Sequence, residues 1–477
     1  MDKTTIHKKL TRGFLSLTLR KAVIDLANFL TIYVVLASIL PFSLLGIFVI
    51  ASGILAFFSY FSDFGLAGAI IQKKEVTDDD LKTTFLIQEL TAFIISATVW
   101  FAAPLLANYY NFDDGGMWLI RVLGVGFFLT SLKVIPSVLL ERDLRFERVV
   151  WTDIIEAIVF NVLLIYLSFN NYGIWAFIWA VLAQRISGLI AIYILAPWRV
   201  KVGYSKKSAA ELFHFGVPFQ LNSILALLKD RLTPLITAFI LGSEKTGYIS
   251  WAQGIANRPL EVMSIVIRIT FPAFSRLQHD KEALKEIVEK ALFLTVVLLY
   301  PVLFGIMAVL PVFIEVMGKQ KFEPTMHLIY IFIIASFWSI PSTTFTNVLN
   351  AVGKIKITLI LMVMWTLLTW ILAPIFAIYF DYTGVAIAYL LISFTSIIPI
   401  ILVKNMFFID IFGSIVKPLA ASATMAGLVF GLSLLLPRNL ITLIFLVIVG
   451  IIIYTAIIFL FAKKNILLTW HSFKNVK

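Results

Sequence analysis

The sequence predicts an all-α polytopic membrane protein with about 14 transmembrane helices. Of its 477 residues, 60% are hydrophobic and only 14% are charged, whereas soluble domains carry roughly 25% charged residues. The mean hydropathy is +0.97, and a helix needs about 20 apolar residues to cross a bilayer. Runs of this length lie at about 16–39, 43–69, 85–108, 117–140, 149–169, 173–197, 214–241, 247–272, 291–317, 326–350, 357–380, 383–404, 413–436 and 439–462. Turn-forming residues such as Pro41, Gly242, Asp381 and Pro437 fall between the runs and support these boundaries.

The distribution of lysine and arginine predicts which ends of the spans are cytoplasmic. With the N-terminus inside, the cytoplasmic segments carry 28 basic residues and the outer turns carry four. This bias follows the positive-inside rule and places both termini in the cytoplasm. The net charge of +12 is then a topology signal facing anionic lipid, and it gives no support to nucleic-acid binding. The first 20 residues show no small-residue cleavage site, so we expect a retained tail and not a signal peptide.

Two short repeats predict that the first 12 spans form two similar halves. The string GIFVIASG at 46–53 recurs as GYISWAQG at 247–254, and IPS at 135–137 recurs at 340–342. Six spans per half give both halves the same orientation, which is typical of parallel-repeat transporters with a site between the halves. We expect six-helix lobes at 1–200 and 201–405, followed by two accessory helices and a cytoplasmic tail at 406–477.

Charges inside the spans are the candidates for the functional site. The string LLKDRLTPL at 227–235 places Lys229, Asp230 and Arg231 near the middle of the seventh span. A charge at the centre of a membrane helix costs about 2.5–3.5 kcal/mol and therefore faces a cavity or a partner. Lys229 and Arg231 project about 200° apart on an ideal helix, so they share one site only if Pro234 bends it.

Two further spans carry basic residues at depth. Arg258 lies midway along the eighth span with Glu261 one turn away, and Arg185 lies halfway along the sixth. The surplus of basic residues favours a bound anion, although the acids could instead neutralise the cations as inert ties between helices. The predicted site therefore comprises the cations Lys229, Arg231, Arg258 and Arg185; the acids Asp230, Glu261, Asp25 and Asp63, which could tune the cations or couple transport; and the lining residues Asn28, Asn222 and Trp251.

Four strings carry a resemblance to a known family. They are FSDFGLAGAIIQKKEVTDDDLKTTF (61–85), VIPSVLLERDLRFER (134–148), GYISWAQGIANRPLEV (247–262) and FPAFSRLQHDKEAL (271–284). They resemble the polysaccharide-transport branch of the MOP superfamily, which contains the Wzx-like flippases, and the resemblance covers about residues 10–405. Its more specific elements are Asp63 with Gly65, and the arginine-containing segment 140–146.

This resemblance implies two six-helix lobes around a central cavity that opens alternately to each side. It implies a flippase, not an enzyme, that moves an oligosaccharide on polyprenyl pyrophosphate from the cytoplasmic to the outer leaflet of a bacterial or archaeal cytoplasmic membrane. The implied partners are the lipid-linked oligosaccharide, membrane lipids and a polysaccharide polymerase or glycosyltransferases. Cations on the cavity wall suit a pyrophosphate. No cofactor is implied, although transport could be coupled to a proton or sodium ion.

Other function classes remain open on the sequence alone. A membrane glycosyltransferase or polymerase could use Asp78, Asp79 and Asp80 to hold a metal, but these residues are more simply the polar cap of the third span, and we expect no metal site. A cation-coupled drug antiporter of the same superfamily would share the fold, but it should offer buried carboxylates and not cations. The segment DKEALKEIVEK at 280–290 predicts a short amphipathic helix leading into the ninth span.

Overall fold

Helices account for the fold throughout the described part of the chain, and those residues include no strand. In the computed structural model, the described residues are 24, 27–28, 30–59, 66–67, 70, 73, 75–143 and 145–475. Of these, 33, 59, 146, 214–232, 264–265, 268–269, 272 and 461–475 are described by their backbone alone. The chain divides into two compact units, Met1–Gly247 and Tyr248–Lys477. The predicted lobe boundaries at 200 and 405 stay predictions.

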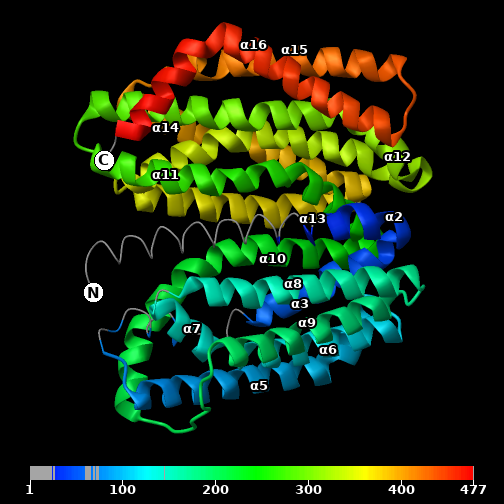
Figure 1. Ribbon diagram of the computed structural model, residues 1–477, viewed down its shortest axis with the longest axis vertical. Helices are drawn as coiled ribbons and strands as arrows, with labels where there is room; N and C mark the ends of the chain where they lie inside the picture. The colour runs from blue at the N-terminus through cyan, green and yellow to red at the C-terminus, as the bar shows by residue number, and fades with distance from the viewer. Residues whose placement is uncertain are drawn as a thin grey trace. The chain divides into compact units, whose positions relative to one another are not determined.

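The first unit contains the helices up to the break in α10 (Figure 1). They are η1 (Leu30–Leu36), α2 (Ala37–Ile39), α3 (Phe42–Ser59), α5 (Asp78–Tyr109), α6 (Asp114–Ser131), α7 (Val134–Arg142), α8 (Phe146–Phe169), α9 (Ile174–Leu195) and most of α10 (Lys206–Asn257). Within the unit, α8 packs on α9, α5 on α6, and α6 on both α9 and α3.

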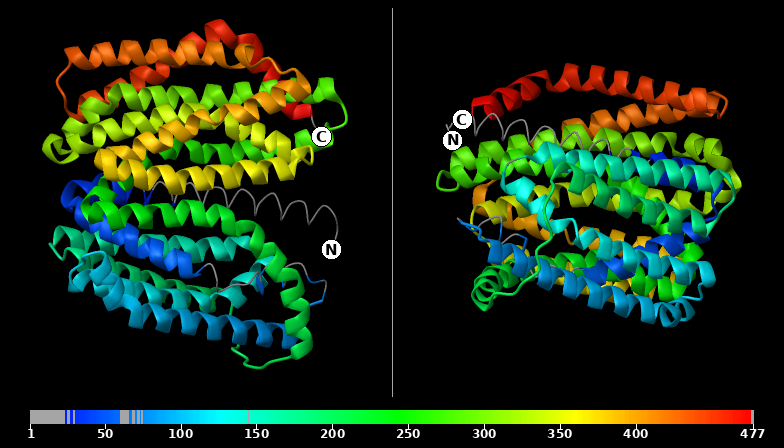
Figure 2. Two further views of the ribbon diagram at one scale, coloured as in Figure 1. Left: turned by 180° about the vertical axis from the view of Figure 1, so that it is seen from behind. Right: turned by 60° about the horizontal axis from the view of Figure 1, so that its bottom comes forward.

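The second unit is built around a long, broken helix, α12. Its elements are η2 (Arg258–Val262), α11 (Met263–Arg276), α12 (Lys281–Ala351), α13 (Ile355–Phe394), α14 (Ile397–Phe407), α15 (Ile411–Leu435) and α16 (Leu440–Asn475). The views in Figures 1 and 2 agree that α15 and α16 lie beside α12. Ala308, Val312, Met425, Val429 and Leu446 form the buried apolar contact among these three helices.

The longest helices are pairs of spans joined at a sharp break. The backbone leaves the helical region at Gly242 in α10 (φ 78°), at Gly318 in α12 (φ 108°) and at Asp381 in α13 (φ 55°). Glycine adopts positive φ without steric cost, which explains two of the three breaks. All three breaks lie between predicted spans.

The predicted class, an all-α polytopic membrane protein, is confirmed. Among the described residues, seven helices are long and apolar enough to cross a membrane, and α6 with α7, bent by 41°, would make an eighth. Since α12 and α13 each contain two predicted spans, the number of such helices is smaller than the number of spans.

The start of α5 confirms the predicted cap but corrects its position. Thr77 accepts a hydrogen bond from the backbone N–H of Asp80, and the Asp80 carboxylate accepts one from the Thr77 N–H at 2.9 Å. This capping box begins the helix at Asp78, two turns before the predicted apolar run at 85, because acidic residues are favourable in the first turn.

The start of α12 corrects a second prediction. Residues 280–290 are helical, with Leu284, Ile287 and Val288 buried and Lys290 paired with Glu286, as the pattern predicted. They do not form a separate short helix, because α12 begins at Lys281 and continues into the ninth span. No glycine or proline occurs between 281 and 300 to end it.

The repeated glycines lie at a close helix crossing in the first unit. A Cβ on Gly46 would lie 1.8 Å from the carbonyl oxygen of Ser243, and one on Gly247 would lie 2.2 Å from that of Phe42. Any larger residue would push the backbones apart. The first glycine of each repeated string, Gly46 and Gly247, therefore serves the close approach of α3 to the residues that follow the break at Gly242.

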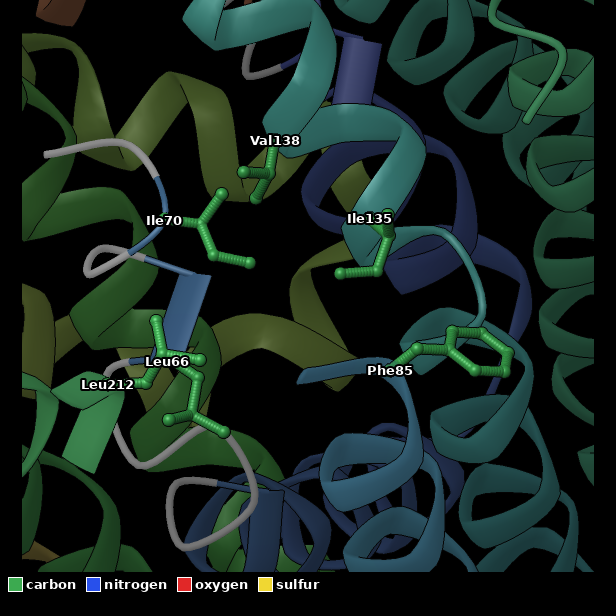
Figure 3. Packing of buried hydrophobic residues seen from close by; sticks show 6 residues of the cluster. All are labelled: Leu66, Ile70, Phe85, Ile135, Val138 and Leu212. Atoms are coloured by element: carbon green, nitrogen blue, oxygen red, sulfur yellow. The ribbon is translucent and has the colours of Figure 1, made fainter. Parts of the chain in front are cut away.

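An apolar cluster binds one end of the first unit together. Figure 3 shows the buried side chains of this cluster, which come from α5, α7, α10 and the segment before α5: Leu66, Ile70, Phe85, Ile135, Val138 and Leu212. All six are at most 6% exposed. Ile135, from the repeated IPS string, therefore serves this core.

Candidate functional site

Three charged side chains meet in the interior of the first unit. The Nζ of Lys133 donates to Oε1 of Glu156, and Nη1 of Arg185 lies 3.7 Å from Oε2 of the same carboxylate. Lys133 and Glu156 are only 9% and 6% exposed, whereas the Arg185 side chain is 30% exposed. We call Lys133, Glu156 and Arg185 the lobe-1 triad.

Three different helical elements position the triad. Lys133 lies at the bend between α6 and α7, while Glu156 lies near the middle of α8 and Arg185 near the middle of α9. At 1.5 Å per residue, Arg185 is about 17 Å along α9, close to mid-membrane. The carbonyl of Leu132, at the bend, accepts a hydrogen bond from the Tyr193 hydroxyl at 3.1 Å. This bond satisfies a backbone group that the helix break leaves open.

Glycines leave the room that these side chains occupy. A Cβ on Gly188 of α9 would lie 1.8 Å from Oε1 of Glu156, and one on Gly126 of α6 would lie 3.1 Å from Cγ of Arg185. The Glu156 carboxylate therefore fills the notch that Gly188 leaves on α9.

The triad carries one more positive charge than negative. A buried charge is costly unless it is paired and hydrogen-bonded, and the Lys133–Glu156 pair meets this condition. At 3.7 Å, Arg185 is too far from Glu156 for a hydrogen bond. Its guanidinium makes no hydrogen bond within the described part of the chain and is partly accessible. The arrangement thus offers an anion a fixed cation with unused donors.

Polar contacts on neighbouring helices extend this polar interior. Asn161 of α8 donates to Oδ1 of Asn28 at 2.9 Å, so the predicted lining residue Asn28 is half-buried and tied to α8. Ser131, at the end of α6, donates to Oε2 of Glu89 on α5 at 2.8 Å. The other oxygen of Glu89 is buried without a hydrogen-bond partner among the described residues.

In the second unit, the predicted pair Arg258 and Glu261 is formed. Arg258 Nη1 lies 2.9 Å from Glu261 Oε1, with the two side chains 28% and 45% exposed. Pro259 follows Arg258, and the α-helix gives way there to the 3₁₀ helix η2, because proline cannot donate the next backbone hydrogen bond. Trp251 is a core residue, 2% exposed and packed against the rings of Phe313 and Phe322.

The remaining predicted site residues lie beyond what the structure describes. Asp25 and Asp63 are outside the described residues. Asn222, Lys229, Asp230 and Arg231 belong to the part of α10 described by its backbone alone. Their proposed roles stay predictions.

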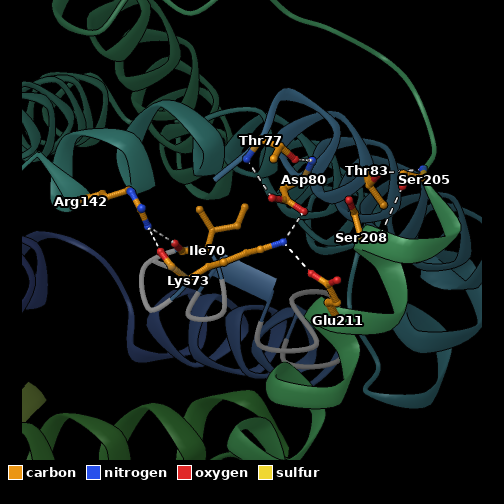
Figure 4. Close-up of polar contacts among 9 residues, drawn as sticks. All are labelled: Ile70, Lys73, Thr77, Asp80, Thr83, Arg142, Ser205, Ser208 and Glu211. Atoms are coloured by element: carbon orange, nitrogen blue, oxygen red, sulfur yellow. Dashed lines mark hydrogen bonds and ion pairs between the residues drawn. The ribbon is translucent and has the colours of Figure 1, made fainter. Parts of the chain in front are cut away.

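A polar network ties two of the family-like strings together at one end of the first unit (Figure 4). Lys73 Nζ donates to Asp80 and to Glu211, each at 2.8 Å. These two hydrogen bonds, to Asp80 first, raise the pKa of Lys73 above its ordinary value of 10.5. Arg142 Nη1 donates to the carbonyl oxygens of Ile70 and Lys73, at 2.8 Å for Ile70. The arginine of the 140–146 element thus binds the backbone at Ile70 and Lys73 of the first string.

The described residues offer no metal-ligand cluster, and the cavity found among them is apolar. Among the described residues, no three His, Cys, Asp or Glu side chains are grouped closely enough to hold a metal ion. A cavity of about 330 Å³ lies between α12, α15 and α16, with walls that include Gly305, Val309, Met425, Gly450 and Tyr454. Its lining is almost wholly apolar and contains none of the predicted site residues.

Sequence reasoning missed Lys133 and Glu156. Both were visible as charges inside the predicted spans 117–140 and 149–169, which is the same signal that selected Arg185. Arg185 itself was predicted, but without the carboxylate that holds it.

Proteins with similar sequences are named for the biosynthesis of lipopolysaccharide, teichuronic acid or succinoglycan. The chain is 24% identical over 327 residues to the lipopolysaccharide biosynthesis protein WzxC of Escherichia coli (strain K12), covering 68% of this chain and 66% of that protein. It is 22% identical to the teichuronic acid biosynthesis protein TuaB of Bacillus subtilis (strain 168), covering 61% of each chain. It is 24% identical to the succinoglycan biosynthesis transport protein ExoT of Rhizobium meliloti (strain 1021), covering 67% of this chain and 65% of that protein. The chain thus covers somewhat less than two thirds of the length of these relatives.

Solved structures show the same fold. The lipid II flippase MurJ in an inward closed conformation superposes with a TM-score of 0.75 over 96% of this chain and 100% of that chain, at 13% identity. An inward-facing multidrug resistance MATE family transporter of the MOP superfamily gives a TM-score of 0.61 over 83% of this chain and 97% of that chain, at 15% identity. Residues 35–327 match the family model described as polysaccharide biosynthesis protein. The chain is therefore a multi-pass membrane protein that belongs to this polysaccharide biosynthesis family, which confirms the resemblance seen in its sequence.

Proposed function

We propose that the protein is a flippase that moves an oligosaccharide on polyprenyl pyrophosphate from the cytoplasmic to the outer leaflet by alternating access. Its membership of a polysaccharide biosynthesis family supports this function. So do the names of its relatives, one of which is a transport protein for succinoglycan biosynthesis. The protein moves its substrate without changing it, and both termini face the cytoplasm.

The observation that carries the proposal is that Arg185 is accessible and has unused hydrogen-bond donors. It is a cation close to mid-membrane whose side chain is 30% exposed. The nearby Glu156 carboxylate already accepts a hydrogen bond from Lys133, so it does not neutralise Arg185 fully. A planar guanidinium with free donors matches the oxygens of a pyrophosphate, and binding an anion would offset the surplus charge of the triad. A cationic drug would be repelled there.

Coupling to a proton or sodium ion belongs to the same proposal. Glu261 lies 2.9 Å from Arg258, so gain of a cation by this carboxylate would release Arg258. The triad and this pair would then bind the anionic group in turn during the cycle. Glycosyltransferases would supply the lipid-linked oligosaccharide and a polymerase would consume it.

The test is to follow the lipid-linked oligosaccharide in cells that lack the native gene. Cells carrying the wild-type protein should export the polysaccharide. Cells carrying Arg185→Gln or Arg258→Gln should insert the protein normally and accumulate the lipid-linked oligosaccharide on the cytoplasmic face. Normal export in cells carrying the Arg185→Gln, Arg258→Gln double variant would contradict the proposed role of these cations.

A further inference from the structure

A second cationic site lies away from the triad, on the hairpin of α5 and α6. The Cζ of Arg121 is 5.2 Å from the ring centroid of Trp100 and 5.1 Å from that of Trp118. The two indoles meet edge to face, with their centroids 5.9 Å apart and their planes at 86°. The guanidinium is therefore clasped between two aromatic rings contributed by neighbouring helices.

Unlike Lys133, Arg185 and Arg258, Arg121 has no acid partner among the described residues. Lys133 and Arg185 share Glu156, and Arg258 pairs with Glu261. Arg121 forms no ion pair among the described residues, and its Nε is buried without a hydrogen-bond partner there. A cation over the face of an indole is attracted by the negative charge of the ring face. This attraction stabilises the charge, but it leaves the guanidinium donors without an oxygen acceptor.

The position of Arg121 along the helices corresponds to the membrane surface. The predicted apolar run of α5 ends at 108 and that of α6 begins at 117, so Arg121 lies about 6 Å inside the outer end of its predicted span. Arg121 lies about 10 Å along α6 from its first residue, Asp114. This is the level at which lipid headgroups meet hydrocarbon and at which tryptophan is enriched in membrane proteins.

The site is built into a rigid hairpin and is open on one side. The Ser96 hydroxyl donates to the carbonyl of Gly124, and the Val99 side chain lies against Gly124. These contacts hold α5 and α6 in register next to Arg121 and its two tryptophans, which we call the clasp. Trp118 is 37% exposed and Trp100 is half-buried, so part of each indole is accessible. Exposed large apolar side chains on a membrane helix face lipid, so the open side of the clasp faces lipid as well.

We propose that Arg121, Trp100 and Trp118 form a binding site for the phosphate group of a membrane glycerophospholipid. The guanidinium donates its free N–H groups to two phosphate oxygens, which is the geometry that arginine prefers. The indoles shield this ion pair from water and pack against the glycerol and the first carbons of the acyl chains. The site is independent of the proposed transport site.

Lipid binding to the purified full-length protein in detergent tests the proposal by native mass spectrometry. The probes are phosphatidylglycerol, diacylglycerol with the same acyl chains, and glycerol 3-phosphate. The wild-type protein should bind phosphatidylglycerol at least tenfold more tightly than the other two molecules. Arg121→Gln should lose that tenfold preference, and Arg121→Lys should retain part of it, because an ammonium carries the charge without the planar fork. The matched control Phe101→Leu, a change at an exposed side chain that follows Trp100 on α5, should bind like the wild type.

Three results would overturn the proposal. One is phosphatidylglycerol binding by folded Arg121→Gln at the wild-type level, and another is equal binding of diacylglycerol, which lacks the phosphate. The third is binding of glycerol 3-phosphate as tight as that of the phospholipid, which would make the site one for free anions. Should Arg121→Gln not fold, Arg121→Lys and Trp118→Leu decide the question. Both must weaken phosphatidylglycerol binding relative to Phe101→Leu, and unchanged binding in either would overturn the proposal.

Discussion

Lys133, at the bend between α6 and α7, is ion-paired with Glu156 in the middle of α8. Both side chains are buried, and the same carboxylate faces Arg185 of α9. One acidic residue therefore connects three helical elements of the first unit, and it fixes the orientation of the one member of the triad that is accessible. Both the stability of this unit and the placement of Arg185 should depend on Glu156.

Replacing Glu156 by Gln should destabilise the protein by about 3–5 kcal/mol, because it leaves Lys133 as an unpaired buried charge. Thermal unfolding in detergent measures the effect. The double variant Lys133→Met, Glu156→Gln should recover most of the loss, since the unpaired buried lysine is removed as well. A Glu156→Gln protein that unfolds at the wild-type temperature would show that the pair contributes nothing to stability.

Gly188→Ala should disrupt the triad from the opposite side. Its Cβ would lie 1.8 Å from the Glu156 carboxylate, so the carboxylate must leave the notch on α9. We expect a lower unfolding temperature and loss of transport. Gly427→Ala is the matched control, because nothing lies within 4 Å of a Cβ there and alanine favours the helix by about 1 kcal/mol. Equal behaviour of the two variants would contradict the packing described for Gly188.

The sequence predicts features that depend on neighbouring residues better than contacts between residues that are far apart in the chain. Hydropathy and turn residues act locally, so the spans and the breaks at Gly242 and Asp381 were predictable. The Lys133–Glu156 pair joins residues 23 positions apart, and it exists only once the start of α7 packs on α8. Trp251 illustrates a second limit, because periodicity places a residue on an inward face without saying whether that interior is filled. In this chain, Phe313 and Phe322 fill it.

The hydrogen bonds of Lys73 should stabilise the folded protein up to high pH. Hydrogen bonds to Asp80 and Glu211 raise the pKa of Lys73 above its ordinary value of 10.5. Its contribution is therefore complete below about pH 10.5 and is lost as the pH rises through the higher pKa of the folded protein. The difference in unfolding temperature between the wild type and Lys73→Met should be constant from about pH 8 to pH 10 and should shrink above that range. A difference that disappears below pH 10 would contradict the assignment.

Labelling of single cysteines should report the predicted topology, and the cysteine-free chain makes each label specific. Three positions at turns or helix breaks should react from outside the cell, and three others should react only from the cytoplasm. The outer positions are Asp114, Ser243 and Gln320, and the inner positions are Asp79, Lys207 and Lys285. One position on the wrong face would break the argument for two lobes of equal orientation.

The most direct test of the central claim is flipping by the purified protein in liposomes. The substrate is a fluorescent oligosaccharide on polyprenyl pyrophosphate, and its arrival in the opposite leaflet is read by a membrane-impermeant quencher. The wild type and Gly427→Ala should flip this lipid, and Arg185→Gln should flip it at least tenfold more slowly while remaining folded. Flipping by Arg185→Gln at the wild-type rate, or no flipping by the wild type in liposomes supplied with a proton or sodium gradient, would contradict the account.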